Sequence, residues 1–127
     1  MPSFKFNHIA LSVKDVNASV DFYQNVFQFE ELENTASNSK TRWLSLGEGR
    51  ELHLIPRPDA VIKTNKAVHF AMATSDLTAF ITHIETLGIA YSDWKDTPLK
   101  NYVRDDGIRQ VYFQDPDAYW IEVNEAF

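Results

Sequence analysis

The feature that most restricts the fold of this chain is an internal repeat. A stretch near the N-terminus aligns with a stretch in the second half so that His8 falls on His69 and Asp15 on Asp76. Apolar residues coincide in the same register on both sides of each Asp. Self-similarity of this kind predicts two copies of one supersecondary unit that bury their apolar faces together.

Each copy predicts the same order of elements. Alternating apolar and polar residues before the Asp are typical of a half-buried strand. The Asp is suited to cap a helix, and apolar residues follow it at helical spacing. Three strand-like runs then follow in each copy. They are FEELE, TRWLSLG and RELHLIP in the first half, and IAYSDW, IRQVYFQ and YWIEVNE in the second. Each half therefore reads as βαβββ.

We expect an α+β fold built from these two tandem βαβββ modules. Module 1 is expected at about 4–56 and module 2 at about 66–125, within a single domain spanning 1–127. The segment PRPDAVIKTN carries two prolines, which cannot continue a ladder, and it predicts a linker between the modules. One helix cannot cover a whole sheet, so the modules are expected to form one curved mixed sheet around a cavity, with the helices on its convex face.

Composition narrows the class of protein. Hydrophobic residues make up 44% of the 127 residues and charged residues 24%, as in soluble globular domains. The net charge of −6 would repel phosphate backbones, so nucleic acid is not an expected partner. No apolar run reaches the length of a membrane span and no secretory signal is recognisable, so a cytoplasmic location is expected. The chain has no Cys, so a metal would have to be held by His, Asp or Glu.

Strand alternation places four candidate metal ligands on one inferred face of the sheet. His8, His69 and Glu122 are the residue types of a two-histidine, one-carboxylate site, and His53 would add a fourth ligand. Such a set suits a divalent Zn, Ni, Co, Mn or Fe ion with open positions for water or substrate. Glu51 shares the parity of His53 and is the alternative fourth ligand. A single His on a strand is more often hydrogen-bonded or exposed than a ligand.

The same alternation suggests residues that contact a substrate. Trp43, Tyr112 and Trp120 are expected to face the cavity, although aromatic side chains there could instead fill the core. Arg42 and Arg109 occupy matching places in the two copies. Arg109 is a candidate for holding an anionic substrate group, and the alternative is a surface salt bridge.

These motifs resemble the vicinal oxygen chelate superfamily. The resemblance rests on a His strand followed by Asp and a helix ending in FYQNVFQF, then LHLI, a second His strand and QVYFQDPDAYWIEV. That superfamily includes glyoxalase I, extradiol dioxygenases, fosfomycin-resistance transferases and bleomycin-binding proteins. The resemblance implies that His8, His69 and Glu122 occupy the family's metal positions and that His53 occupies an additional ligand position. The chain departs from the pattern at Ala118, where Gly is usual, and VFQFEE replaces the common VLGF.

The resemblance also implies a reaction. Members chelate two neighbouring oxygens of a small-molecule substrate and stabilise an enediolate-type intermediate, with Glu122 as the first candidate for the catalytic base. A fourth ligand favours a glyoxalase-like isomerase or lyase. An extradiol dioxygenase, a fosfomycin-type thiol transferase and a non-catalytic bleomycin-binding protein remain alternatives. A homodimer is expected, while its module exchange, the substrate, any use of glutathione and the metal stay open.

Overall fold

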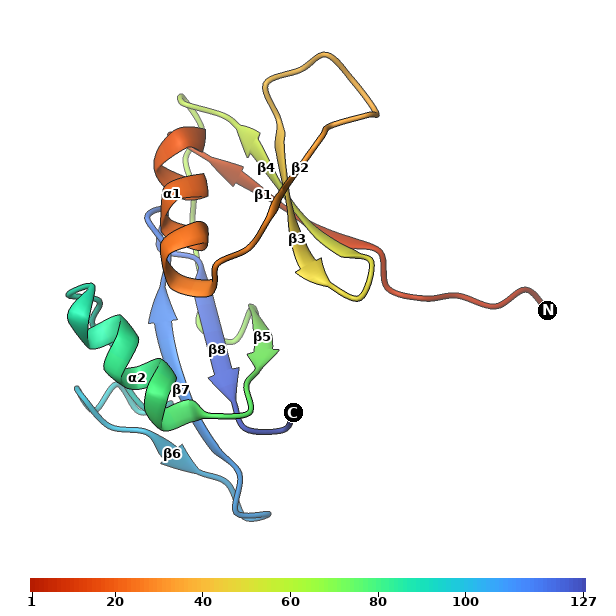
Figure 1. Cartoon of the computed structure of the whole chain (residues 1–127). Coiled ribbons are helices and arrows are strands. Elements are labelled where there is room, and N and C mark those ends of the chain that lie inside the picture. The colour runs from red at the N-terminus through yellow and green to blue at the C-terminus, as the bar shows by residue number, and fades with distance from the viewer. The chain divides into compact units, whose positions relative to one another are not determined.

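The computed structural model describes residues 1–127 and divides the chain into two compact units. We call Met1–Ile62 module 1 and Lys63–Phe127 module 2. The boundary falls inside the proline-containing segment that the sequence predicts as a linker. Each module is a helix and a small sheet, as Figure 1 shows for each part of the chain separately.

Module 1 has the expected order of elements. They are β1 (His8–Val13), α1 (Val16–Phe27), β2 (Glu31–Leu32), β3 (Arg42–Gly47) and β4 (Arg50–Pro56). The sheet order is β1-β4-β3-β2, with β1 parallel to β4 and the other neighbours antiparallel. The first strand and the last strand of the module are therefore side by side.

Module 2 repeats this topology. Its elements are β5 (His69–Ala73), α2 (Leu77–Thr86), β6 (Tyr102–Val103), β7 (Arg109–Gln114) and β8 (Trp120–Asn124). The sheet order is β5-β8-β7-β6, again with the first strand parallel to the last. The prediction of tandem βαβββ modules with mixed sheets in an α+β fold is confirmed. Each module forms its own four-stranded sheet.

Both helices begin at the aspartates that the sequence predicts as caps. The Asp15 carboxylate accepts a hydrogen bond from Ala18 N at 3.1 Å, and that of Asp76 accepts one from Ala79 N at 2.9 Å. Gly88 follows α2 with φ of +71°, a conformation that glycine adopts without a Cβ clash. The two helix starts are alike because the same local contact forms in each copy.

The apolar rows of each sheet face the helix of their own module. In module 1, α1 contacts β3 and β4. The buried core side chains there are Leu11, Val13, Val20, Tyr23, Val26, Leu44, Leu52 and Leu54. In module 2, the Phe80 ring of α2 lies 5.8 Å from the Phe113 ring of β7. The core side chains there include Leu77, Ile84, Val111, Phe113, Ile121 and Val123. The alternate residues of every strand, which include all four candidate ligands, are left for the other face.

The strand predicted at IAYSDW does not form. Ser92 makes only an isolated bridge to Tyr112, and the chain then turns because the Asp93 carboxylate accepts a hydrogen bond from Thr97 N at 2.8 Å. The edge strand is instead β6, which pairs with β7 and lies in a segment that had no predicted structure. The number of strands is as predicted, but the second strand of module 2 begins at Tyr102, 13 residues after the predicted start at Ile89.

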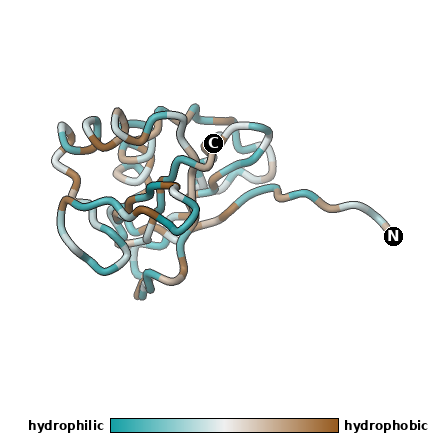
Figure 2. Tube along the Cα trace, turned by 90° about the horizontal axis from the view of Figure 1, so that it is seen from below, coloured by the Kyte–Doolittle hydropathy of each residue, from teal (hydrophilic) through white to brown (hydrophobic).

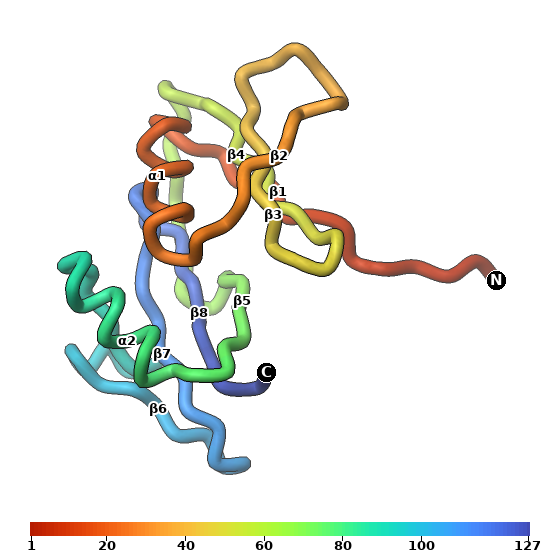
Figure 3. Tube along the Cα trace, viewed as in Figure 1, coloured from red at the N-terminus to blue at the C-terminus, as the bar shows by residue number.

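The chain ahead of β1 contains no regular element. It runs as an extended segment away from the sheet of module 1 (Figure 3). Figure 2 shows hydrophobic and hydrophilic residues mixed along the whole trace. Neither helix combines the length and the apolar composition that crossing a membrane requires.

Candidate metal and substrate site

In module 1, three aromatic rings from neighbouring strands are stacked on one another. The centre of the His8 ring of β1 lies 4.1 Å from the centre of the His53 ring of β4, and the angle between the two ring planes is 16°. The Trp43 ring of β3 lies 4.3 Å from the same His53 ring, with an interplanar angle of 5°. Because β4 lies between β1 and β3, His53 is held between the other two rings. Two predicted ligands and one predicted substrate contact therefore lie on one face of this sheet.

The two histidines also have polar partners. His53 Nε2 lies 2.9 Å from Glu51 Oε1, and His8 Nδ1 lies 2.7 Å from Asn7 Oδ1. Glu51 and His53 were the two alternatives for the fourth ligand, and the structure brings them into direct contact. Either group is thus available on the same patch of module 1.

Module 2 brings the other two predicted ligands together. His69 Nε2 lies 3.4 Å from Glu122 Oε1, and His69 Nδ1 lies 2.8 Å from the carbonyl oxygen of Lys66. A carbonyl oxygen can only accept, so Nδ1 carries a hydrogen and Nε2 is the nitrogen that can offer a lone pair. Both His69 Nε2 and Glu122 Oε1 can donate a lone pair to a divalent cation. A backbone-bonded imidazole next to a carboxylate is a common arrangement of metal ligands.

Glu122 is buried and held by two donors. Tyr112 donates to its Oε1 at 2.8 Å, and Asn124 donates to its Oε2 at 2.7 Å. Gln110 Nε2 in turn donates to the Tyr112 hydroxyl at 2.6 Å. Burial, followed by the hydrogen bond to Glu122, raises the pKa of Tyr112 far above its usual value. Tyr112 therefore keeps its hydrogen and fixes the direction of the Glu122 carboxylate.

Lys66 is a further residue of this site, and the sequence analysis missed it. Its ammonium nitrogen lies 2.7 Å from Asp96 Oδ1, 2.9 Å from the Asp93 carbonyl oxygen and 3.0 Å from that of Trp94. The same nitrogen lies 4.7 Å from the centre of the Trp120 ring and 5.1 Å from that of Tyr112. Lys66 thus joins the loop after α2 to the aromatic residues of β7 and β8.

The backbone of Lys66 contributes separately, because its carbonyl oxygen accepts the hydrogen bond from His69. One residue therefore orients a predicted ligand and anchors a loop. Its loop contacts lie 27 to 30 residues away in the sequence, and no local pattern signals such contacts.

Arg109 has an arrangement that matches the ion-pair alternative. Its guanidinium donates to both Glu125 oxygens, at 2.6 and 3.1 Å, and to Thr78 Oγ1 of α2 at 3.1 Å. Arg109 alternates with Tyr112 along β7 and so belongs to the helix side of the sheet. Arg42 makes the equivalent contacts to Glu31 and Asn17 in module 1. Both arginines join a sheet to the first turn of its helix.

The four predicted ligands therefore occur as two pairs. His8 and His53 lie together in module 1, and His69 and Glu122 lie together in module 2. Neither module by itself groups three His, Asp or Glu side chains that could hold an ion. Each pair supplies neutral imidazole or carboxylate donors of the kind that divalent transition metals bind.

Known proteins resemble this chain in both sequence and fold. A family model described as the Glyoxalase/Bleomycin resistance protein/Dioxygenase superfamily matches residues 5–123. Glyoxylase I 4 of Arabidopsis thaliana is 29% identical over 126 residues, covering 92% of this chain and 68% of that protein. Metallothiol transferase FosB of Shouchella clausii is 29% identical over 122 residues, covering 93% and 77%. The crystal structure of the fosfomycin resistance protein FosX of Listeria monocytogenes superposes with a TM-score of 0.78 at 25% identity, covering 100% and 96%.

Proposed function

This chain belongs to the glyoxalase/bleomycin resistance protein/dioxygenase superfamily, and we propose that it is a metal-dependent, glyoxalase-like isomerase or lyase. Its substrate would be a small molecule with two neighbouring oxygen atoms. Relatives named as a glyoxylase and as a metallothiol transferase support an enzymatic role. The observation that carries the proposal is the presence of one ligand pair on the same type of strand face in each module.

We propose that His8, His53, His69 and Glu122 together hold one divalent ion, which would be Zn, Ni, Co, Mn or Fe. The donor set supports this assignment, because three imidazoles and one carboxylate suit these ions without thiolate ligands. The His69 Nε2 atom facing Glu122 at 3.4 Å supports it further, since a cation between them would satisfy both groups. Glu51, in contact with His53, is the alternative fourth ligand.

The residues of this chain have distinct roles in the proposed reaction. A bound ion would supply Lewis-acid polarisation of a substrate oxygen. Glu122 Oε1 would accept a proton from the carbon beside that carbonyl and return it to the neighbouring carbon. Tyr112 and Asn124 would keep the Glu122 carboxylate in one orientation by their hydrogen bonds.

Aromatic side chains would form the walls around the substrate. Trp43 lies against His53, and Trp120 and Tyr112 lie around the Lys66 ammonium, so flat surfaces occur beside both ligand pairs. Arg109 would remain in its pairing with Glu125. We also propose a homodimer in the cytoplasm, on the basis of the family resemblance alone.

Metal analysis of protein purified without added ions tests the proposal. We expect about one ion per wild-type chain and a large loss in His69→Ala, because removing one ligand of a four-ligand site weakens binding strongly. The matched control is His83→Ala, which changes a histidine in α2 and should leave the metal content unchanged. Equal metal content in His69→Ala and wild type, or no metal in any of the three proteins, would contradict the proposal.

Activity measurements separate the related functions. A glyoxalase-like enzyme should exchange the proton beside the carbonyl of a 2-oxoaldehyde thiohemiacetal with deuterium from the solvent. Oxygen consumption with a catechol would instead identify a dioxygenase, and thiol addition to an epoxide phosphonate would identify a thiol transferase. Tight binding of a small molecule with no metal and no turnover would identify a binding protein.

A further inference from the structure

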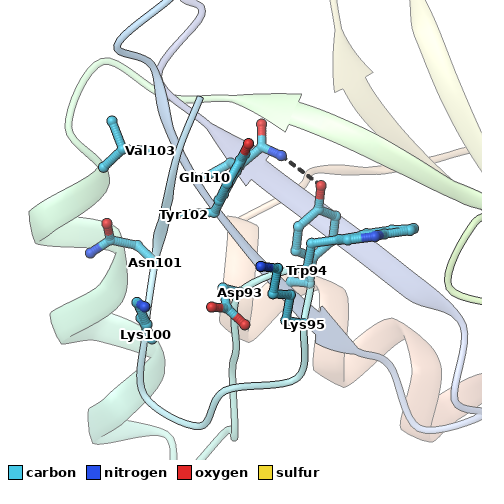
Figure 4. A pocket seen from close by; sticks show the side chains of 9 residues that line it. Asp93, Trp94, Lys95, Lys100, Asn101, Tyr102, Val103 and Gln110 are labelled. Atoms are coloured by element: carbon cyan, nitrogen blue, oxygen red, sulfur yellow. Dashed lines mark hydrogen bonds between the residues drawn. The ribbon is translucent and has the colours of Figure 1, made fainter. Parts of the chain in front are cut away.

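Module 2 contains a cavity of its own. Its volume is about 590 Å³, which is in the size range of small-molecule sites. It lies between the loop that follows α2 and the strands β6 and β7, and Figure 4 shows its lining side chains. Trp94 and Lys95 come from the loop, Lys100 and Tyr102 from the segment leading into β6, and Tyr112 from β7.

The charged groups of this cavity favour an anion. The ammonium groups of Lys95 and Lys100 form none of the ion pairs of the structure. The one carboxylate of the lining is that of Asp93, and the hydrogen bond from Thr97 N, together with the nearby charge of Lys100, holds its pKa below the usual range, so it stays ionised. Two cationic groups and one carboxylate therefore line this cavity, which gives it a net positive charge in a chain whose net charge is −6. An anionic ligand would gain two charge-assisted contacts here.

The aromatic groups favour a flat ligand. Trp94 is 44% exposed and Tyr102 is 40% exposed, so part of each aromatic surface is available to a ligand. In Figure 4 the Trp94 and Tyr102 side chains lie on different sides of the hollow, with Lys95 between them. An unsaturated or aromatic body placed between these rings would cover both apolar surfaces.

The cavity is connected to the proposed catalytic carboxylate. Gln110 lines it and donates to the Tyr112 hydroxyl, and Tyr112 also lines it and donates to Glu122. One side chain, Tyr112, therefore separates the cavity from Glu122. A ligand that occupies the cavity would lie next to the group proposed to move the proton.

We infer that this cavity binds the anionic end of the substrate, and that the substrate class is a flat, unsaturated or aromatic molecule bearing a carboxylate or a phosphonate. Lys95 and Lys100 pair with the anionic group, and Trp94 and Tyr102 contact the flat body. The inference rests on the proposed function for the reaction that the substrate undergoes. The binding itself depends only on residues of module 2.

Titrations of the protein with small probes test this inference. Phenylphosphonate and benzoate serve as the anionic probes, benzyl alcohol is the uncharged probe, and NMR shifts of backbone amides report where each one binds. We expect both anions to bind at millimolar concentrations and to shift amides in the segment 93–103. Benzyl alcohol should bind at least about 10-fold more weakly, because it lacks the charge-assisted contacts.

The double variant Lys95→Gln/Lys100→Gln should weaken binding of both anions by about 10-fold or more. Its matched control is Lys5→Gln/Lys40→Gln, which changes the net charge equally at exposed positions of module 1 and should bind as wild type does. Wild-type affinity in the Lys95→Gln/Lys100→Gln variant would overturn the inference. Absence of anion binding by wild type, or equal binding of benzyl alcohol, would overturn it as well.

The same samples separate this inference from the proposed function. Each titration is run on protein as purified and after treatment with a chelator, and the effect of the lysine substitutions should be the same in both. Lysine-dependent binding to a wild-type protein that holds no metal would overturn the proposed function and support the cavity assignment. Normal metal content in a protein whose anion binding does not depend on the two lysines would overturn the cavity assignment and leave the proposed function standing.

Discussion

Five residues other than glycine adopt the left-handed backbone conformation that favours glycine, and two of them lie where the sequence departs from the family pattern. Gln28 ends α1 with φ of 59°, and Ala118 lies in the turn between β7 and β8 with φ of 68°. These are the two places where the sequence departs from the family pattern, one in VFQFEE and one in DPDAYW. Each Cβ is costly in the left-handed region, by about 1–2 kcal/mol for an average residue. The departures therefore reduce stability without touching a predicted ligand.

We predict that Ala118→Gly stabilises the protein. Relief of the Cβ clash should exceed the added backbone entropy of glycine in the unfolded chain, giving a net gain of about 0.5–1 kcal/mol. Gln28→Gly should act in the same direction. Thermal unfolding followed by circular dichroism should show an increase in Tm of about 2–5 °C.

The matched control for this prediction is Ala79→Gly, an exposed position in α2 with ordinary helical geometry. This change should lower stability by about 0.5–1 kcal/mol, because glycine weakens a helix interior. If Ala118→Gly lowers the Tm as Ala79→Gly does, the left-handed conformation of Ala118 is not a source of strain.

Each sheet is tied to the first turn of its helix by an arginine. Arg109 joins Glu125 to Thr78, and its hydrogen bond to Glu125 lowers the pKa of that carboxyl from its ordinary value of 4.5. A lowered carboxyl pKa adds stability above the ordinary value, and this stability is lost as the pH falls through the lowered value. The contribution of this pair should thus be complete at neutral pH and disappear in acid.

We predict that Arg109→Gln lowers the Tm at pH 7 and that the difference from wild type shrinks below about pH 4.5. Thermal unfolding at several pH values between 7 and 3 measures this. Arg50→Gln is the control, because its partner Glu48 is 87% exposed and solvent screens that pair. A difference between Arg109→Gln and wild type that is independent of pH would show that the pairing with Glu125 is not its cause.

The elements that the sequence predicted correctly depend on local contacts. A capping carboxylate accepts a hydrogen bond from a residue three positions later, so Asp15 and Asp76 are recognisable from spacing alone. Alternation along β1, β4, β5 and β8 also determines which side chains share a face. The face that carries each predicted ligand was therefore accessible without a structure.

The elements that the sequence did not predict depend on distant contacts. IAYSDW has the composition of a strand, but Lys66 holds the carbonyl groups of Asp93 and Trp94, and the Asp93 side chain bonds to Thr97. These contacts use backbone groups that a regular ladder would otherwise pair. The later strand β6 and the role of Lys66 follow from this loop, and no periodic pattern encodes it.

For the chain as a whole, duplication divides the proposed site between two modules. One copy supplies two imidazoles, and the other supplies an imidazole and a carboxylate. Two ligands hold a divalent ion weakly, whereas four hold it well. The central claim is therefore that both pairs bind the same ion.

A titration of chelator-treated protein with Co²⁺, comparing wild type with His8→Ala and His69→Ala, tests this claim most directly. We predict one tight site per wild-type chain, and a loss of that same site in each variant, although the two substitutions lie in different modules. Two sites per wild-type chain, each removed by only one of the substitutions, would contradict the claim.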